Sequence, residues 1–184
     1  MKVLPAIEER HSVRSYEPRP LEPEALETVL QAARMAPTGQ NARHVRLFVV
    51  QDPQVLAELN RLVIQAMTRG NTVGANRVPP EGYCFYYHAP ALVFTAVPKE
   101  AYNAFSDTGC VLENAMLQAA ELGLGSCWLN NLRRAQADPD LAAYLRSLGV
   151  REEEQITGGL ALGYPAAAGK PNPRQDGNEI IRIG

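Results

Sequence analysis

The sequence predicts a single domain, residues 1–184, in which helices and strands alternate without forming a doubly wound dinucleotide-binding fold. A chain of 184 residues is long enough to bury one hydrophobic core. Amphipathic helical patterns alternate with short apolar runs along its length. No strand-to-helix connection carries G-x-G-x-x-G, the glycine pattern that lets a dinucleotide approach the backbone closely.

The first helix is expected over residues 23–36. Pro23 suits the first helical position, and apolar residues follow it at helical spacing. Pro37 ends this helix, because proline cannot continue the helical hydrogen-bond pattern. The apolar run at 45–50 then predicts a strand.

A second helix is expected to begin with Asp52 as its N-cap and Pro53 as its first residue. Glycine, proline and asparagine are frequent in residues 68–82, which we expect to form a mobile loop. The apolar run at 91–97 predicts the next strand.

A third helix is expected over about 107–122, and it is unusually apolar. Its polar residues occupy a narrow stripe: Glu113, Asn114, Gln118 and Glu121. The remaining surface is wider than the apolar stripe of an ordinary surface helix, so it needs cover on more than one side. A second subunit and burial within one chain explain this equally well. Gly123 ends the helix, and 126–129 reads as a short strand.

The Asp-Pro pair at 138–139 opens another helix, which Gly149 ends. Residues 155–162 read as a strand, and the tail over 163–177 is expected to be extended. Residues 179–183 are strand-like but have no local partner. We therefore expect them to pair with the sheet edge of another chain.

Composition excludes several classes of function. Hydrophobic residues make up 46% of the chain and the net charge is −2, without a basic block. These values disfavour disorder, nucleic-acid binding and binding to anionic membranes. No apolar run approaches about 18 residues and no signal-peptide core begins the chain, so a cytoplasmic location is expected.

Cysteine and histidine patterns give no sign of a metal site or a disulfide framework. The cysteines are odd in number and form no C-x-x-C pair: Cys84, Cys110 and Cys127. Each has apolar neighbours, so all three are expected to be core thiols. The three histidines show no metal-ligand spacing. Any chemistry must therefore come from an organic cofactor, or the protein carries out none.

In R-H-S-V-R at residues 10–14, two arginines and a serine occupy every second position. In an extended segment Arg10, Ser12 and Arg14 share one face, with the arginines roughly 13 Å apart at about 3.3 Å per residue. Such a row suits a long ligand that carries an anion, because arginine binds phosphate bidentately. A solvated arginine-rich edge strand explains the same row equally well.

Three further motifs change the interpretation of this row. They are the polar turn A-P-T-G-Q-N at 36–41, G-L-G-S-C-W at 123–128, and G-G-L-A-L-G-Y-P at 158–165. By itself the turn also fits an ordinary helix-to-strand loop. With the row, the motifs resemble the flavin-dependent nitroreductase family in order and spacing over roughly residues 4–174.

This resemblance implies an α+β fold of three layers, in which helices flank a mixed, mainly antiparallel sheet. It also implies an intertwined homodimer with FMN bound at the subunit interface. The C-terminal arm, residues 164–184, is then expected to contact the partner subunit.

The resemblance also assigns roles to residues of the basic row. Arg10 and Ser12 hold the FMN phosphate together with Arg174 from the tail. Arg14 lies at the N1/O2 edge of the ring, where negative charge accumulates on reduction. His11 points away by alternation and is left with a backbone contact at most. Lys170 is interpreted as a solvated lysine.

Two other segments complete the site that the resemblance implies. Residues near flavin N5 are Leu129, Asn130 and Asn131. Residues supplied by the partner subunit are Pro37, Thr38, Gly39 and Asn41. No side chain is assigned as catalytic, because the cofactor carries the hydride chemistry.

The implied activity is that of an FMN-dependent NAD(P)H oxidoreductase with a ping-pong mechanism. NADH or NADPH delivers a hydride to flavin N5, and a nitroaromatic, a quinone or a similar acceptor then receives it.

The family's usual N-x-Q-P-W is replaced here by N-A-R-H-V at 41–45. This departure leaves open a flavin-binding or sensing protein without turnover. A specialised branch, such as an azoline dehydrogenase, a dehalogenase or a flavin-fragmenting enzyme, also stays open.

Overall fold

The computed structural model describes residues 3–74, 78–167 and 178–184. Within these residues, four strands form one sheet in the order β1-β2-β4-β3, and all three neighbouring pairs are antiparallel. The strands are β1 (Arg46–Val50), β2 (Ala91–Pro98), β3 (Gly125–Leu129) and β4 (Glu154–Gly163). Residue Ser12 adds one parallel bridge, to Ser126 of β3. This mixed, mainly antiparallel sheet confirms the expected α+β arrangement.

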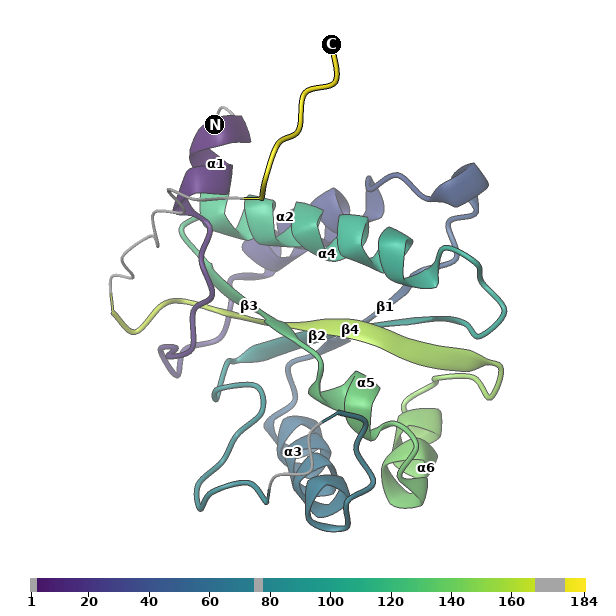
Figure 1. Ribbon diagram of the computed structural model, residues 1–184. Helices are drawn as coiled ribbons and strands as arrows, with labels where there is room; N and C mark the ends of the chain where they lie inside the picture. The colour runs from purple at the N-terminus through teal and green to yellow at the C-terminus, as the bar shows by residue number, and fades with distance from the viewer. Residues whose placement is uncertain (1–2, 75–77, 168–177) are drawn as a thin grey trace.

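Helices cover both faces of the sheet (Figure 1). One layer contains α1 (Val3–Glu9), α2 (Pro23–Arg34) and α4 (Ala104–Glu121). The opposite layer contains α3 (Pro53–Thr68), α5 (Asn131–Ala135) and α6 (Pro139–Ser147). A short 3-10 turn, η1 (Gly39–Asn41), precedes β1. The result is the three-layer architecture that the motifs implied.

Two hydrophobic cores lie on the two faces of the sheet, and β2 contributes to both. Leu92 and Phe94 pack with residues of α3 and α6. Ala91 and Val93 pack with residues of α2 and α4. Because successive side chains of a strand point to opposite faces, a strand covered on both sides must be apolar throughout. This explains the uninterrupted apolar run of β2.

The helix starts predicted from proline and aspartate are confirmed. Pro23, Pro53 and Pro139 each begin a helix. The Asp52 side chain accepts hydrogen bonds from the backbone N–H groups of residues 54 and 55. Asp138 caps α6 in the same way, through residues 140 and 141. These bonds satisfy N–H groups that a helix cannot satisfy internally.

Helix α4 is covered mainly within the chain, by the sheet and by α2. Its Asn114 side chain donates to the Ala32 carbonyl of α2 at 3.2 Å. Phe105 and Cys110 nevertheless remain exposed on it. The interpretation of all three cysteines as core thiols is therefore wrong for Cys110, which lies on the outer side of this helix, whereas Cys84 and Cys127 are buried.

Three differences from the predicted elements have physical causes. Helices α1 and α5 were not predicted, because seven and five residues are too few to show a helical period. The strand expected over 179–183 has no partner within the described part of this chain, and its pairing with another chain stays a prediction. Described residues 178–184 are exposed and pair with no described strand. An apolar segment forms a strand only beside a partner edge.

The N-terminal segment joins the sheet at the outer edge of β3. The Val13 N–H group donates to the Ser126 carbonyl at 2.9 Å, and the Glu17 N–H group donates to the Tyr164 carbonyl at 2.8 Å. Gly125 makes this approach possible. A Cβ atom at position 125 would lie 2.8–2.9 Å from three carbon atoms of the Val13 side chain.

We predict that Gly125→Ala destabilises the fold. The added methyl group overlaps the Val13 Cβ, which cannot rotate away, and such overpacking costs about 1–3 kcal/mol. For a chain of this size, the melting temperature should fall by roughly 2–12 °C. Differential scanning calorimetry measures this change. An unchanged melting temperature would show that the N-terminal segment does not dock tightly on β3.

Candidate functional site

The basic row is only partly extended. The Arg10 N–H group donates to the Ala6 carbonyl at 3.0 Å, so Arg10 closes the last turn of α1. Ser12 and Arg14 are exposed on either side of buried Val13, which is the alternation of an extended segment. The prediction that all three polar residues belong to one extended row is therefore wrong for Arg10. The unpredicted helix α1 is the reason.

Arg10 lies beside a carboxylate and a small cavity. Its Nε atom is 3.5 Å from Oε1 of Glu113 on α4. The cavity, of about 220 Å³, is lined by both Arg10 and His11. His11 Nδ1 lies 2.9 Å from the Glu9 carbonyl, whereas its Nε2 is buried without a hydrogen-bond partner. His11 thus lines the same cavity as Arg10 instead of pointing away from it.

Arg14 lies next to an aromatic segment, residues 83–88. Its guanidinium carbon is 6.0 Å from the centre of the Tyr87 ring. The pKa of Arg14 is raised above its usual value, chiefly by a side-chain contact with Tyr87. Tyr87 and His88 both have a φ of 56°, in the left-handed region that such residues rarely adopt. Arg14 is therefore permanently charged beside a constrained turn.

The segment after β3 reaches the same aromatic turn. Leu129 is buried at the end of β3, and the Asn130 Oδ1 atom accepts a hydrogen bond from the Trp128 ring at 3.1 Å. Asn131 begins α5 and donates to the Tyr83 hydroxyl at 2.9 Å. The structure thus brings this segment and Arg14 to one aromatic turn.

The interpretation of the motifs did not include Tyr83 and Tyr87. The available signal was the density of aromatic residues before β2, in Y-C-F-Y-Y-H at 83–88. Cys127, which lies nearby, is no candidate nucleophile, because burial raises the pKa of its thiol.

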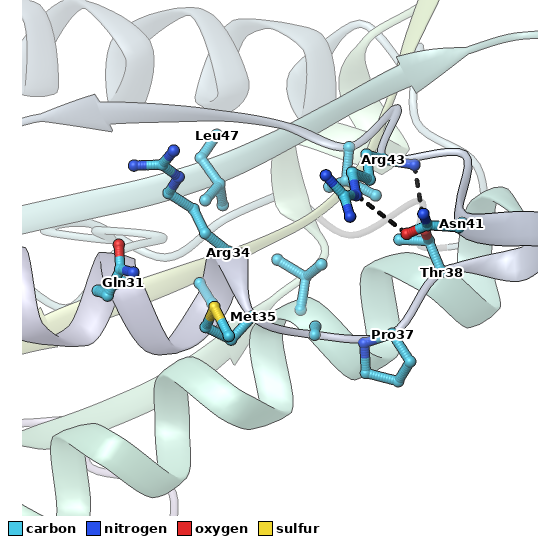
Figure 2. Close-up of a pocket in the computed structure, with 12 residues that line it drawn as sticks. Gln31, Arg34, Met35, Pro37, Thr38, Asn41, Arg43 and Leu47 are labelled. Carbon is cyan, nitrogen blue, oxygen red and sulfur yellow. Dashed lines mark hydrogen bonds between the residues drawn. The ribbon is translucent and has the colours of Figure 1, made fainter.

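The polar turn at 37–41 borders a larger cavity, of about 570 Å³ (Figure 2). Arg34 and Arg43 also line it, and its lining contains no carboxylate. The Arg43 Nε atom donates to Asn41 Oδ1 at 2.9 Å, and the Arg43 N–H group donates to Thr38 Oγ1 at 3.0 Å. The turn therefore presents amide, hydroxyl and guanidinium groups to a cavity without negative charge.

The turn has an unusual backbone. Gln40, Asn41 and Arg43 have φ values of 54°, 56° and 50°. Left-handed residues other than glycine cost of order 1 kcal/mol or more each, and they persist where surrounding contacts hold them. Gly39 packs against the Asn103 side chain so closely that a Cβ atom would overlap it. A buried carboxylate of α4, Asp107, accepts the Gly39 N–H at 2.9 Å.

The candidate residues form two separate groups in the structure. The basic row and residues 129–131 lie along β3, whereas the turn at 37–41 leads into β1. These strands are the two outer strands of the sheet. They are roughly 14 Å apart, given three spacings of about 4.8 Å. Within one copy of the chain, the two groups therefore lie at opposite edges of the sheet.

Arg174 and Lys170 lie outside the described residues. Within the described ranges, no group of His, Cys, Asp and Glu residues is placed to hold a metal ion. No helix in those ranges has the length and apolar character that crossing a membrane requires.

Comparison with known proteins identifies relatives along nearly the whole chain. Residues 7–164 match the Nitroreductase family. A nitroreductase from Bacteroides fragilis, solved with bound FMN, is 34% identical. The match covers 100% of both chains with a TM-score of 0.90.

Two relatives at the sequence level are more distant. One, from Archaeoglobus fulgidus, is named as an NADH dehydrogenase/NAD(P)H nitroreductase. It is 29% identical, over 88% of this chain and 84% of the relative. An NADPH-dependent oxidoreductase from Staphylococcus haemolyticus is 25% identical, over 94% of this chain and 69% of the relative.

Proposed function

This chain belongs to the nitroreductase family, and from that premise we propose that it is an FMN-dependent NAD(P)H oxidoreductase. The observation that carries the proposal is the 34% identity, over the full length of both chains, to a structure with bound FMN. We propose small oxidised molecules, such as nitroaromatics and quinones, as the electron acceptors. We also place the enzyme in the cytoplasm, which agrees with its three free cysteines.

The residues of the basic row fit the phosphate of FMN. Arg10 supplies a guanidinium that is largely shielded from solvent, and Ser12 supplies an exposed hydroxyl. His11 lines the same cavity, but its Nδ1 donates to the Glu9 carbonyl, so Nε2 of the neutral ring is an acceptor and gives the phosphate no hydrogen bond. A phosphate can accept hydrogen bonds from the Arg10 guanidinium and the Ser12 hydroxyl, because its oxygens accept several hydrogen bonds at once.

When bound, FMN supplies the two-electron chemistry that takes a hydride from NADH or NADPH and passes it to the acceptor. Arg14 provides a fixed positive charge that stabilises negative charge developing at the ring edge. Its contact with Tyr87 holds that charge in place. Asn131, fixed by Tyr83 at the start of α5, orients the backbone that faces the reacting edge.

The site is completed by a second copy of the chain. This proposal rests on the separation between the basic row beside β3 and the turn before β1. It also rests on α1, whose side chains Val3, Leu4 and Ile7 are exposed although apolar. We assign Pro37, Thr38, Gly39 and Asn41 to the FMN bound by the partner. We propose residues 164–184 as the arm that reaches the partner subunit, although residues 168–177 lie outside the described residues.

We predict that the purified protein binds FMN and that NADH or NADPH bleaches its absorbance near 450 nm, a wavelength typical of flavins, under anaerobic conditions. Adding a nitroarene or a quinone should then restore the absorbance. Stopped-flow spectrophotometry measures both half-reactions. Bound FMN that neither nicotinamide can reduce would instead favour the binding or sensing protein without turnover.

We predict that Arg10→Ala weakens FMN binding. A hydrogen bond to a charged group is worth about 1.5–3 kcal/mol, so the Kd should rise by roughly 10-fold to 150-fold. Quenching of flavin fluorescence on titration of the apoprotein measures the Kd. Arg61→Ala is the matched control, because Arg61 is an exposed arginine on α3 that pairs with Glu58. Equal Kd values for both variants would remove Arg10 from the phosphate site.

We predict that two variants complement each other at an FMN concentration that fills the wild-type site but the site of neither variant. Arg10→Ala damages the basic row, and Gly39→Ala damages the turn by overlapping Asn103. In a shared site, each mixed dimer retains one intact site, so random mixing should restore about a quarter of the wild-type activity. Activity after co-refolding an equimolar mixture measures this. Failure to exceed the activity of either variant alone would place the whole site within one chain.

A further inference from the structure

A buried carboxylate links helix α4 to the polar turn, which is taken from here on as residues 38–43 so that it includes Arg43. Asp107 lies in the first turn of α4 and is 4% exposed. Its Oδ1 atom accepts the Gly39 N–H at 2.9 Å, and its Oδ2 atom lies 3.0 Å from Nε2 of His44. The N-terminal end of a helix favours a negative charge, which helps α4 to hold this carboxylate in the interior.

The contact between Asp107 and His44 is a close approach of two polar atoms without hydrogen-bond geometry. Neither Asp107 Oδ2 nor His44 Nε2 has a hydrogen-bond partner in the described part of the chain. A buried carboxylate without a partner is costly, so an imidazole beside it is favourable. Asp107 therefore contacts the turn twice, at Gly39 inside it and at His44 directly after it.

The turn's remaining hydrogen bonds, as far as the described residues show, are local. The Asn41 N–H group donates to the Thr38 carbonyl, and the Ala42 N–H group donates to the Gly39 carbonyl. The bonds of Arg43 to Thr38 and Asn41 are local too (Figure 2). Such bonds shape the turn but do not fix its place relative to the sheet and helices.

We propose that Asp107 is a positioning residue of the cofactor site. It holds the strained turn at 38–43 in the place from which Thr38 and Asn41 contact FMN, with His44 as a second point of attachment. The carboxylate does not touch the cofactor. This inference rests on the proposed function for its effect on FMN, and on the structure alone for its effect on the turn.

The test compares three variants. Asp107→Ala removes both contacts, whereas Asp107→Asn keeps an acceptor oxygen for the Gly39 N–H but loses the charge. Thr108→Val is the matched control. Thr108, the next residue of α4, is fully buried, and its hydroxyl lies 2.7 Å from that of Thr157 in β4. Its replacement loosens the helix from the sheet without touching the turn.

For each apoprotein, the FMN Kd is measured by fluorescence titration and the melting temperature by calorimetry. Asp107→Ala should raise the Kd by about tenfold, the scale of one lost hydrogen bond to a charged group. Asp107→Asn should recover most of this loss. Thr108→Val should lower the melting temperature while keeping the Kd within about twofold of wild type. Equal increases in Kd for Asp107→Ala and Thr108→Val would overturn the proposal.

Hydrogen exchange of the apoproteins provides a readout that does not need FMN. Asp107→Ala should speed exchange of the Gly39 amide by about tenfold or more, and Thr108→Val should not. Unchanged Gly39 exchange in Asp107→Ala would refute the positioning role even if FMN binds normally. A wild-type protein that binds no FMN would refute the proposed function, and the exchange data would still decide whether Asp107 holds the turn.

Discussion

The order of strands in the sheet is the constraint on which the rest of the molecule depends. Because β2 and β4 are the central strands of the described sheet and are covered on both faces, β1 and β3 provide its outer edges, where functional segments can lie. The N-terminal segment occupies the edge of β3, and the polar turn leads into β1. The burial that stabilises the fold thus also places the two groups of candidate residues at opposite edges of the sheet. The shared site proposed above would bring them together between two copies.

Helix α4 is the element that connects these two groups within each copy. Asp107 contacts the turn, and Glu113 contacts Arg10 of the basic row. Their separation of six positions corresponds to about 9 Å along a helix at 1.5 Å per residue. Two acidic side chains of one helix therefore meet polar groups from opposite edges of the sheet. Thr108 holds the helix between them through its contact with Thr157.

Much of the fold could be predicted because its signals are local. An Asp-Pro pair starts α3 and α6, and the uninterrupted apolar run of β2 indicates a strand that is buried on both faces. Helix α1 escaped detection because it is too short to show a period, and as a result the basic row was extended one residue too far. The segment 179–183 has the residue pattern of a strand, but a strand also needs a neighbouring strand to pair with. The local sequence does not reveal which strand that is.

The candidate site could be predicted only as far as contiguous motifs describe it. The row, the turn and residues 129–131 are each continuous in sequence, and their likeness to a family drew attention to them. Asp107 meets Gly39 across 68 residues, and Asn131 meets Tyr83 across 48. Neither pairing can be predicted from the spacing of residues in the sequence, because each contact depends on how the sheet brings distant segments together.

The neighbouring charges of Arg10 and Glu113 have a consequence for ligand choice. An arriving anion meets a guanidinium that already faces a carboxylate, so binding is an exchange of counterions and not a simple capture. A singly charged anion such as chloride gains little by replacing one negative charge with another. A doubly charged phosphate ester gains more, and the half-exposed carboxylate loses little by turning into water. If the anion at Arg10 is the FMN phosphate proposed above, Glu113 would thereby favour a dianion over a monoanion at this position.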